Sequence, residues 1–281
     1  MRKTATGLTL MATVLAASAA SAEGTWQYSS GFDYSRGDYG GDPVETKISA
    51  IPFTASYKTT NWTFKGSTSW LEIEGDGTVI GGGDGGIVLG NEERGKSNGR
   101  GNGNSGGSDT ETTEEQRVSS TESGMGDVWL SATYAVPPLP TELGYLDLTG
   151  KVKLPTADED DGLGTGEIDY TLQADYFKPL GKFTPYATLA YKIKGDPSGV
   201  DLKNVFYSSV GSGYRVSEEA NVGLSLDYQQ AATTYGDDSL ELFGYWTQKL
   251  SAQWSATFYA YLGLADGSPD QGLGLQLSYR P

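Results

Sequence analysis

Apolar and polar residues alternate with a period of two along most of this chain. From 146 to 154, apolar residues or glycine occupy every second position, and the positions between them hold Asp147, Thr149, Lys151 and Lys153. The same alternation runs through 168–176, 220–229 and 253–262. Successive side chains of an extended strand point to opposite faces, so each run predicts a strand with one apolar and one polar face.

The alternating runs predict an all-β chain of about twelve strands. They span about ten residues or more, which exceeds the usual length in a globular sheet and matches a tilted crossing of a bilayer. The sequence therefore predicts an antiparallel transmembrane β-barrel, with a soluble β-sandwich as the alternative. The predicted strands cover 24–36, 45–58, 61–74, 122–136, 144–154, 165–178, 183–194, 203–215, 219–230, 238–249, 252–264 and 271–280.

The connections between the predicted strands alternate in length. One set is rich in Gly and Asp and includes the long segment 75–121, whereas the other set, such as 179–182 and 216–218, is mostly short. Short periplasmic turns and longer extracellular loops are typical of outer-membrane barrels, so we expect both termini on the periplasmic side. The apolar faces end in aromatic residues where the membrane interfaces would lie, namely Tyr134, Tyr176, Tyr191, Tyr228, Trp254 and Tyr279.

The first 22 residues have the pattern of an export signal. Arg2 and Lys3 precede a short apolar stretch, and Ala20-Ser21-Ala22 fits a cleavage site. We therefore predict a signal peptide over 1–22 and a single barrel domain over 23–281, located in the bacterial outer membrane.

Segment 75–121 differs in composition from the rest of the chain. It is rich in Gly and then in acidic, Ser and Thr residues, so we expect a mobile extracellular loop. Its run from Gly81 to Gly86 weakly resembles a calcium-binding glycine repeat. Its one apolar patch, Ile87-Val88-Leu89, is a candidate for a partial plug of the barrel mouth.

Charge and missing residue types narrow the possible functions. The chain carries 36 acidic and 20 basic residues, and loss of Arg2 and Lys3 leaves 18 basic residues and a net charge of −18. This balance argues against nucleic acid as a partner. The chain has no His and no Cys, which removes the usual nucleophile–base pairs and most transition-metal sites. We predict no enzyme activity and find no sign of a cofactor; paired carboxylates at Glu167 and Asp169 are a much weaker reading.

The polar strand faces carry charges of both signs and would line the lumen. On adjacent strands these charges are within side-chain reach, so one interpretation is a structural ion-pair network and the other is a selectivity lining for solutes. The candidates for the solute path are Asp127, Trp129, Lys151, Lys153, Glu167, Asp169, Asp175, Lys192, Lys194, Asp227 and Glu241. Inward aromatic residues would either fill space or form a surface for sugars or aromatic solutes: Trp129, Tyr186, Tyr207, Phe243, Tyr245, Tyr259 and Tyr261.

Several motifs after residue 122 resemble an outer-membrane transporter family associated with meta-pathway phenol degradation. They are Ser123-Gly124-Met125-Gly126-Asp127-Val128-Trp129-Leu130, Lys151-Val152-Lys153-Leu154-Pro155-Thr156, Gly162-Leu163-Gly164-Thr165-Gly166 with Asp169-Tyr170, and Thr184-Pro185-Tyr186. The resemblance implies an outer-membrane channel for aromatic or hydrophobic compounds. It also implies that Asp127, Lys153 and Asp169 face inward.

The leading hypothesis is a barrel that passes small solutes through its lumen. Expected partners are small-molecule solutes, outer-membrane lipid and, during biogenesis, the barrel-assembly machinery, although Arg280 and Pro281 follow the aromatic Tyr279 that this machinery would read. The alternative is a barrel-anchored surface protein whose 75–121 loop binds a partner or calcium.

Overall fold

The computed structural model describes residues 24–39, 45–77, 79–81, 87–88, 119–137, 143–234 and 236–281. Within these ranges the regular structure is almost entirely β, apart from a single 3₁₀ position at Leu143. No helix in the described ranges is both long and apolar enough to cross a membrane. The predicted signal peptide over 1–22 lies outside the described residues and stays a prediction.

The strands lie close to the predicted ranges, with most ends displaced by one or two residues. Two very short strands inside the 75–121 segment were not predicted. The strands are β1 (Thr25–Gly37), β2 (Thr46–Lys58), β3 (Trp62–Gly75), β4 (Val79–Ile80), β5 (Ile87–Val88), β6 (Ser120–Met125), β7 (Val128–Ala135), β8 (Tyr145–Leu154), β9 (Asp169–Phe177), β10 (Phe183–Ile193), β11 (Val205–Arg215), β12 (Ala220–Gln229), β13 (Ser239–Lys249), β14 (Trp254–Gly263) and β15 (Gln271–Tyr279).

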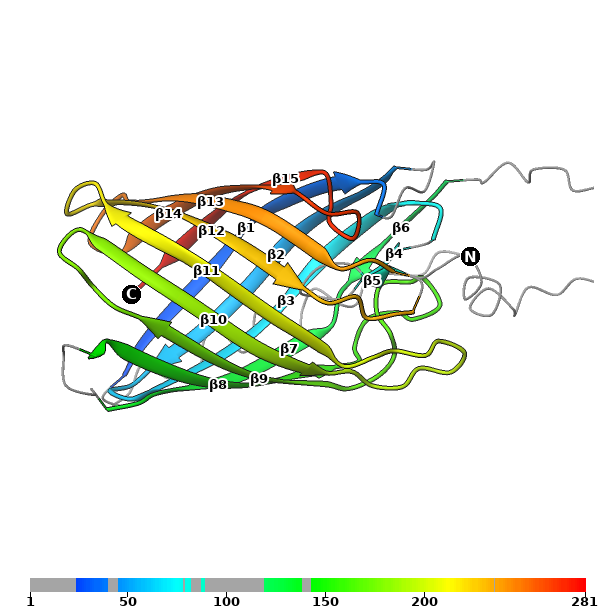
Figure 1. Cartoon of the computed structure of the whole chain (residues 1–281), viewed down its shortest axis with the longest axis horizontal. Helices are drawn as coiled ribbons and strands as arrows, with labels where there is room; N and C mark the ends of the chain where they lie inside the picture. Colours follow the sequence, from blue (N-terminus) through cyan, green and yellow to red (C-terminus); the bar gives the residue numbers. More distant parts are fainter. Residues whose placement is uncertain are drawn as a thin grey trace, which may run out of the picture.

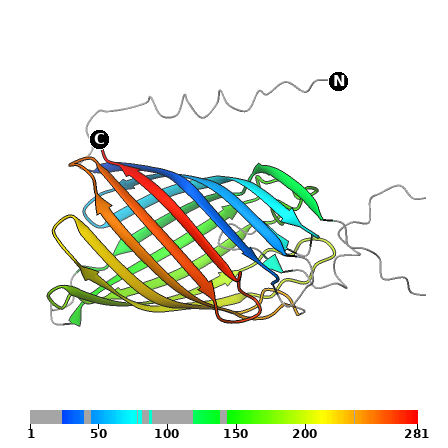
Figure 2. The same ribbon diagram turned by 90° about the horizontal axis from the view of Figure 1, so that it is seen from above.

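The long strands form one closed antiparallel barrel. Each strand pairs with its neighbours in sequence, and β1 pairs both with β2 and with the last strand, β15, which closes the sheet. Because β6 and β7 are two halves of one strand position on β3, the described residues give twelve positions around the barrel. The strands wind obliquely around a common axis (Figures 1 and 2). The predicted fold class is confirmed.

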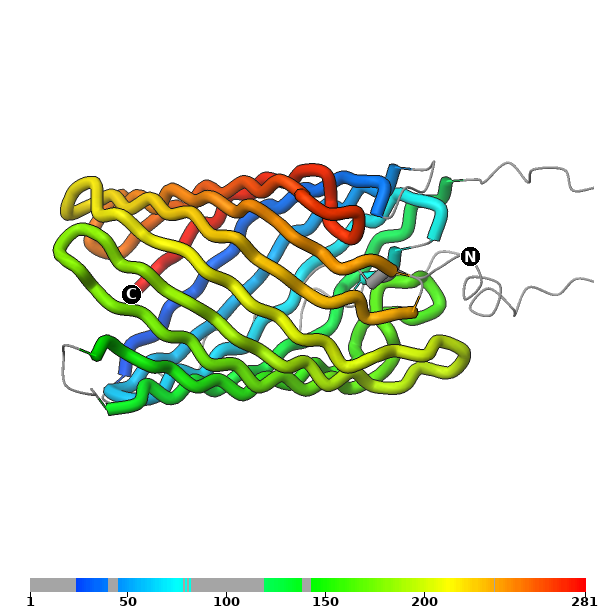
Figure 3. The backbone as a smooth tube through the Cα atoms, viewed as in Figure 1, coloured from blue at the N-terminus to red at the C-terminus, as the bar shows by residue number. Residues whose placement is uncertain are grey.

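The two ends of the barrel differ. The C-terminus lies at the end with the short turns, such as the connection between β11 and β12 (Figure 3). The opposite end carries the long connections, together with the β4–β5 hairpin (Figure 1). This separation of short turns from long connections matches the predicted one, and the assignment of the long connections to the exterior stays a prediction.

The outer wall is apolar and carries aromatic pairs near the short-turn end. Leu172, Leu189 and Phe258 are among many large apolar side chains that are more than half exposed on this wall. Ring centroids lie 4.9 Å apart for Trp62 and Tyr134 and 4.8 Å apart for Trp254 and Tyr279. Exposed apolar surface of this extent is stable only against lipid, and the rings mark one interface of the membrane.

The expected single strand 122–136 is wrong in one respect, because a bulge divides it. Between the pairs Trp70–Met125 and Ser67–Trp129, β3 contributes two residues and the opposite strand contributes three. One extra residue shifts the alternation by one position. As a result Met125 faces outward instead of sharing the inward face with Trp129.

A second correction concerns the predicted strand 165–178. In the structure β9 begins only at Asp169, and residues 165–168 belong to the preceding connection. Glu167 therefore does not lie on a barrel strand. Segment 75–121 is described only in part. Ile87 and Val88 of its apolar patch form β5, whereas Leu89 lies outside the described residues, and the predicted mobility and plug stay predictions.

Closure of the barrel depends on close approach of β1 and β15 at Gly31. A Cβ atom placed on Gly31 would collide with the carbonyl oxygen of Leu275 and the Cα of Gln276, which are backbone atoms and cannot move aside easily. By contrast, a Cβ on Gly150 of β8 would meet nothing within 4 Å.

We expect Gly31→Ala to lower the free energy of unfolding by about 1–3 kcal/mol, because the added methyl group forces the closing strands apart. Gly150→Ala is the matched control and should unfold as the wild type does. Urea unfolding of the refolded barrel in detergent micelles, followed by tryptophan fluorescence, measures both. Equal midpoints for the two variants would contradict the assignment of Gly31 to the closing contact.

Candidate functional site

A buried ion cluster lies on the inner wall where β7, β8 and β9 approach the long connections. The Lys153 Nζ lies 3.3 Å from Asp127 Oδ2 and 3.3 Å from Asp169 Oδ2, and it donates to Thr165 Oγ1 at 2.7 Å. Lys194 Nζ adds a contact of 3.0 Å to the same Asp169 oxygen. Two lysines and two aspartates thus balance each other, which a buried cluster requires.

The bulge between β6 and β7 directs the Asp127 carboxylate into this cluster. Asp127 Oδ1 accepts hydrogen bonds of 3.0 Å from the backbone N–H groups of both Thr156 and Ala157. Thr156 Oγ1 in turn accepts a hydrogen bond from the N–H of Val128 at 2.9 Å. The bulge and the start of the 155–168 connection are therefore held together by hydrogen bonds on both sides.

The 155–168 connection folds inward and covers the cluster. Leu163 is buried and packs against Leu71 and Ile73, which point inward from β3. The carbonyl oxygen of Gly162 accepts a hydrogen bond from Gly81 N at 2.9 Å, so this connection also contacts the beginning of the 75–121 segment. The described part of that segment reaches the barrel mouth through Val79 and Gly81.

Because of this cover, Lys153 does not line the open solute path that the sequence predicted for it. Its side chain points inward as predicted, but it is 0 % exposed, and the Asp127 and Asp169 side chains are nearly as deeply buried. These three residues therefore form ion pairs and do not meet the open lumen. The ion-pair interpretation of the inward charges holds for them.

The other predicted residues are spread over the inner wall. By register Lys151 lies beside Ser131 and Thr171, two residues before Lys153 on β8, and Asp175 accepts a hydrogen bond from Thr188 Oγ1 at 2.7 Å. Lys192 donates to Gln229 Oε1 at 2.6 Å. Trp129 also points inward, and its indole N–H is buried with no hydrogen-bond partner among the described atoms.

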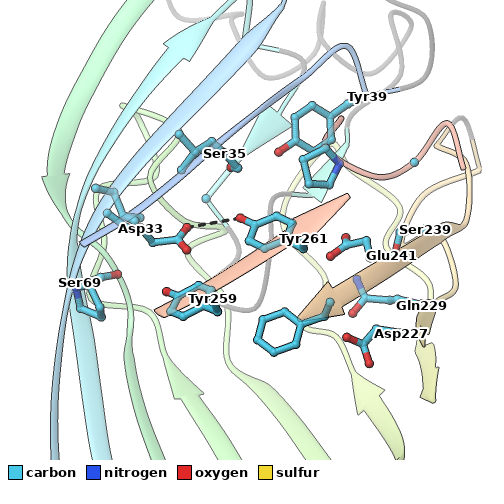
Figure 4. Close-up of a pocket in the computed structure, with 18 of the residues that line it drawn as sticks. Asp33, Ser35, Tyr39, Ser69, Asp227, Gln229, Ser239, Glu241, Tyr259 and Tyr261 are labelled. Atoms are coloured by element: carbon cyan, nitrogen blue, oxygen red, sulfur yellow. Dashed lines mark hydrogen bonds between the residues drawn. The ribbon is translucent and has the colours of Figure 1, made fainter. Parts of the chain in front are cut away.

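A cavity of about 470 Å³ lies inside the barrel toward the long-connection end (Figure 4). Its lining residues come from β11 to β14, from β1 to β3 and from the long connections. The lining residues are Asp33, Ser35, Tyr39, Ile48, Ala50, Pro52, Ser69, Leu71, Ile73, Gly81, Tyr207, Asp227, Tyr228, Gln229, Ser239, Glu241, Phe243, Tyr259, Tyr261, Gly267 and Pro269.

The cavity walls differ in chemistry. Asp33, Asp227 and Glu241 place carboxylates around it from β1, β12 and β13, with Tyr259 and Tyr261 between them (Figure 4). The Tyr261 hydroxyl donates to Asp33 Oδ1 at 3.4 Å. The side chains that β2 and β3 contribute to the cavity are instead mostly aliphatic, namely Ile48, Ala50, Leu71 and Ile73, with Ser69 as the polar exception.

Sequence reasoning missed this aliphatic wall. On β2, Ile48 and Ala50 face inward while Ile51 and Phe53 face outward, so both faces of the strand are apolar. A period-two signal cannot assign the faces of such a strand. The two predicted cavity residues on β12 and β13, Asp227 and Glu241, do lie together.

The inward tyrosines lie against the barrel wall over glycines. The space of a Cβ on Gly272 is filled by the Tyr261 ring, and that of Gly274 by the Tyr259 ring. Glycine at these positions lets the rings lie flat, which leaves the cavity open. The inward orientation predicted for these aromatic residues agrees with the structure.

Tyr39 follows β1 and bounds the cavity from the long-connection end. Burial raises the pKa of Tyr39 to about 12, and the nearby carboxylates of Glu241 and Asp33 act in the same direction. Its phenol is therefore neutral in neutral solution and adds no charge to the three carboxylates.

A closed barrel with an apolar outer wall, an aromatic interface and a charged interior defines an outer-membrane β-barrel. A family model matches residues 56–280 and carries the name of the MetA pathway of phenol degradation. The chain belongs to this family, as the motifs after residue 122 suggested. No curated protein sequence matches the chain.

Solved structures share the fold at low sequence identity. An outer membrane channel from Pseudomonas putida F1 is similar with a TM-score of 0.62 and 14 % identity, covering 93 % of this chain and 97 % of that one. A KdgM porin is similar with a TM-score of 0.51 and 6 % identity, covering 90 % of this chain and 98 % of that one. At such identity these likenesses show the fold alone.

Loss of the Lys153 ammonium would leave two buried carboxylates with only Lys194 to balance them. We expect Lys153→Met to lower the free energy of unfolding by about 3–5 kcal/mol, because an uncompensated buried charge is costly. Lys47→Met is the control, since it removes an exposed pair with Glu74 (3.1 Å) and should change little. Urea unfolding in micelles compares the two, and similar midpoints would show that the cluster does not stabilise the barrel.

Proposed function

We propose that the barrel is a channel that passes small solutes across the outer membrane. The observation that carries this proposal is the cavity of about 470 Å³ inside a closed barrel, lined by charged and hydroxyl groups. Side chains alone can fill a barrel of about eight strands, whereas twelve strand positions enclose more space. Here part of that space is a cavity with charged and hydroxyl groups on its walls. Polar groups around an open space provide a route for water and solutes.

Membership in the family supports aromatic or hydrophobic compounds as solutes, since the family is named for a pathway of phenol degradation. The inward rings of Tyr259, Tyr261 and Phe243 support the same class, because flat rings can stack on an aromatic solute. The similar protein from P. putida F1 is described as an outer membrane channel.

The proposal assigns no catalytic step to this barrel. The chain contains no His and no Cys, and the suggested carboxylate pair is divided: Asp169 is buried in the ion cluster, whereas Glu167 lies in the connection before β9. The apolar outer wall supports contact with outer-membrane lipid, and the outward Tyr279 of β15 supports recognition by the assembly machinery during biogenesis.

The inner wall offers one lysine that tests whether the lumen conducts. Lys151 points inward, is partly exposed, and forms no ion pair with a described residue. Lys153 is unsuitable for this purpose because it is buried. We expect planar bilayers containing the refolded mature barrel to show reproducible current steps, and Lys151→Glu to shift the reversal potential in a salt gradient toward cation selectivity.

Lys182→Glu is the matched control, because it makes the same change of charge outside the lumen. Lys182 lies in a short turn, and its ammonium lies over the outward Tyr214 ring. Its reversal potential should equal that of the wild type. An inserted barrel without current would argue against a water-filled path. A current with the same reversal potential in wild type and Lys151→Glu would show that the path does not pass Lys151.

A further inference from the structure

We propose that the cavity binds organic cations that carry an apolar or aromatic body, of the arylalkylammonium type. The proposal rests on the transport function above and names the class of solute that its lumen selects. It is drawn from the cavity as a whole, because charge, aromatic faces and an aliphatic wall surround one space of suitable size (Figure 4).

The sign of the solute charge follows from the three carboxylates. None of Asp33, Asp227 and Glu241 forms an ion pair with a lysine or arginine in the part of the chain that the structure describes. Lys192 lies at the edge of the cavity, where its ammonium donates to Gln229 and lies over the Tyr207 ring at 5.4 Å. The cavity itself therefore presents negative charge to a solute.

Asp227 and Glu241 are direct register partners on β12 and β13. Like charges directly opposite each other on neighbouring strands destabilise a sheet. The Asp227 carboxylate accepts a hydrogen bond from Ser225, which satisfies one oxygen but does not neutralise the charge. A cation between the two carboxylates would remove this repulsion.

The tyrosine rings provide a second contact for the same cation. Because Tyr259 and Tyr261 lie flat over Gly274 and Gly272, one face of each ring is turned toward the lumen. An ammonium group over the face of an aromatic ring is attracted by its quadrupole. An anion would be repelled both by these faces and by the carboxylates.

The opposite wall accounts for the apolar body of the solute. Ile48, Leu71 and Ile73 point inward from β2 and β3, and Leu163 of the 155–168 connection packs beside them. A simple metal ion gains nothing from this aliphatic surface, whereas a phenyl or alkyl group is removed from water by it. The volume of about 470 Å³ falls in the range of sites for small organic ligands.

Three probes of one shape test the proposal on the refolded full barrel: 3-phenylpropylammonium, 3-phenylpropan-1-ol and 3-phenylpropionate. Isothermal titration in detergent micelles at neutral pH, with empty micelles subtracted, gives the affinity of each without any need for current. We expect the cation to bind about tenfold more tightly than the alcohol, and the anion to bind most weakly.

The double variant Asp227→Asn with Glu241→Gln should reduce the affinity for the cation to that for the alcohol and leave the alcohol unchanged. The matched control is Glu72→Gln with Glu74→Gln, which removes two carboxylates from the outer face near the same end of the barrel. It should leave all three affinities unchanged. If the double variant does not fold, the ranking of the three probes on the wild type still decides the question.

Equal affinities for cation and alcohol, or tightest binding of the anion, would overturn the proposal. An equal loss of cation affinity in the control would overturn it as well, since it would show a general surface effect. Cation binding by a barrel that passes no current would leave the site in place and argue against the channel. A conducting barrel that binds the cation no more tightly than the alcohol would support the channel and argue against the cation site.

Discussion

The whole structure depends on the need to satisfy every backbone hydrogen bond inside a lipid bilayer. A sheet with free edges would leave rows of unpaired N–H and C=O groups in hydrocarbon, so the sheet must close on itself. Closure here is made by β1 and β15, whose residues pair from Tyr28 with Tyr279 to Arg36 with Gln271. Gly31 lies in this seam, where the two backbones approach too closely for a side chain.

Closure also fixes which residues can act on a solute. Once the sheet is a barrel, alternate side chains must face either outward or into the lumen, and within the lipid-facing band a charged residue is costly on the outer side. The bulge before Val128 changes this alternation at one place, so that Asp127 enters the ion cluster and Met125 turns to the lipid. A local irregularity of one residue thus connects the barrel wall to the connection that covers it.

The ion cluster and the cavity have different roles, although both consist of inward charges. Lys153 and Asp169 are buried and balanced, so they fix the 155–168 connection at the mouth of the barrel. The carboxylates around the cavity lack such partners among the described residues and face open space. Burial and pairing therefore separate structural charges from those available to a solute.

The sequence by itself determined the class of structure, because the period-two pattern, the strand lengths and the alternating connections all have one common solution in a membrane. Motifs around Asp127, Lys153 and Asp169 also indicated the family and the inward direction of these side chains. The sequence could not reveal the bulge, since Gly126 and Val128 continue the alternation without a visible break. Nor could it assign the faces of β2, where Ile48 and Ile51 are both apolar.

Only the tertiary structure decided which inward charges are covered and which are accessible. That distinction depends on the inward fold of the 155–168 connection and on contacts between residues far apart in sequence, such as Leu163 with Leu71. The closing of the barrel also places Asp33 of β1 beside Tyr261 of β14. Periodicity fixes the face of a strand, whereas the contents of a cavity depend on which strands meet across it.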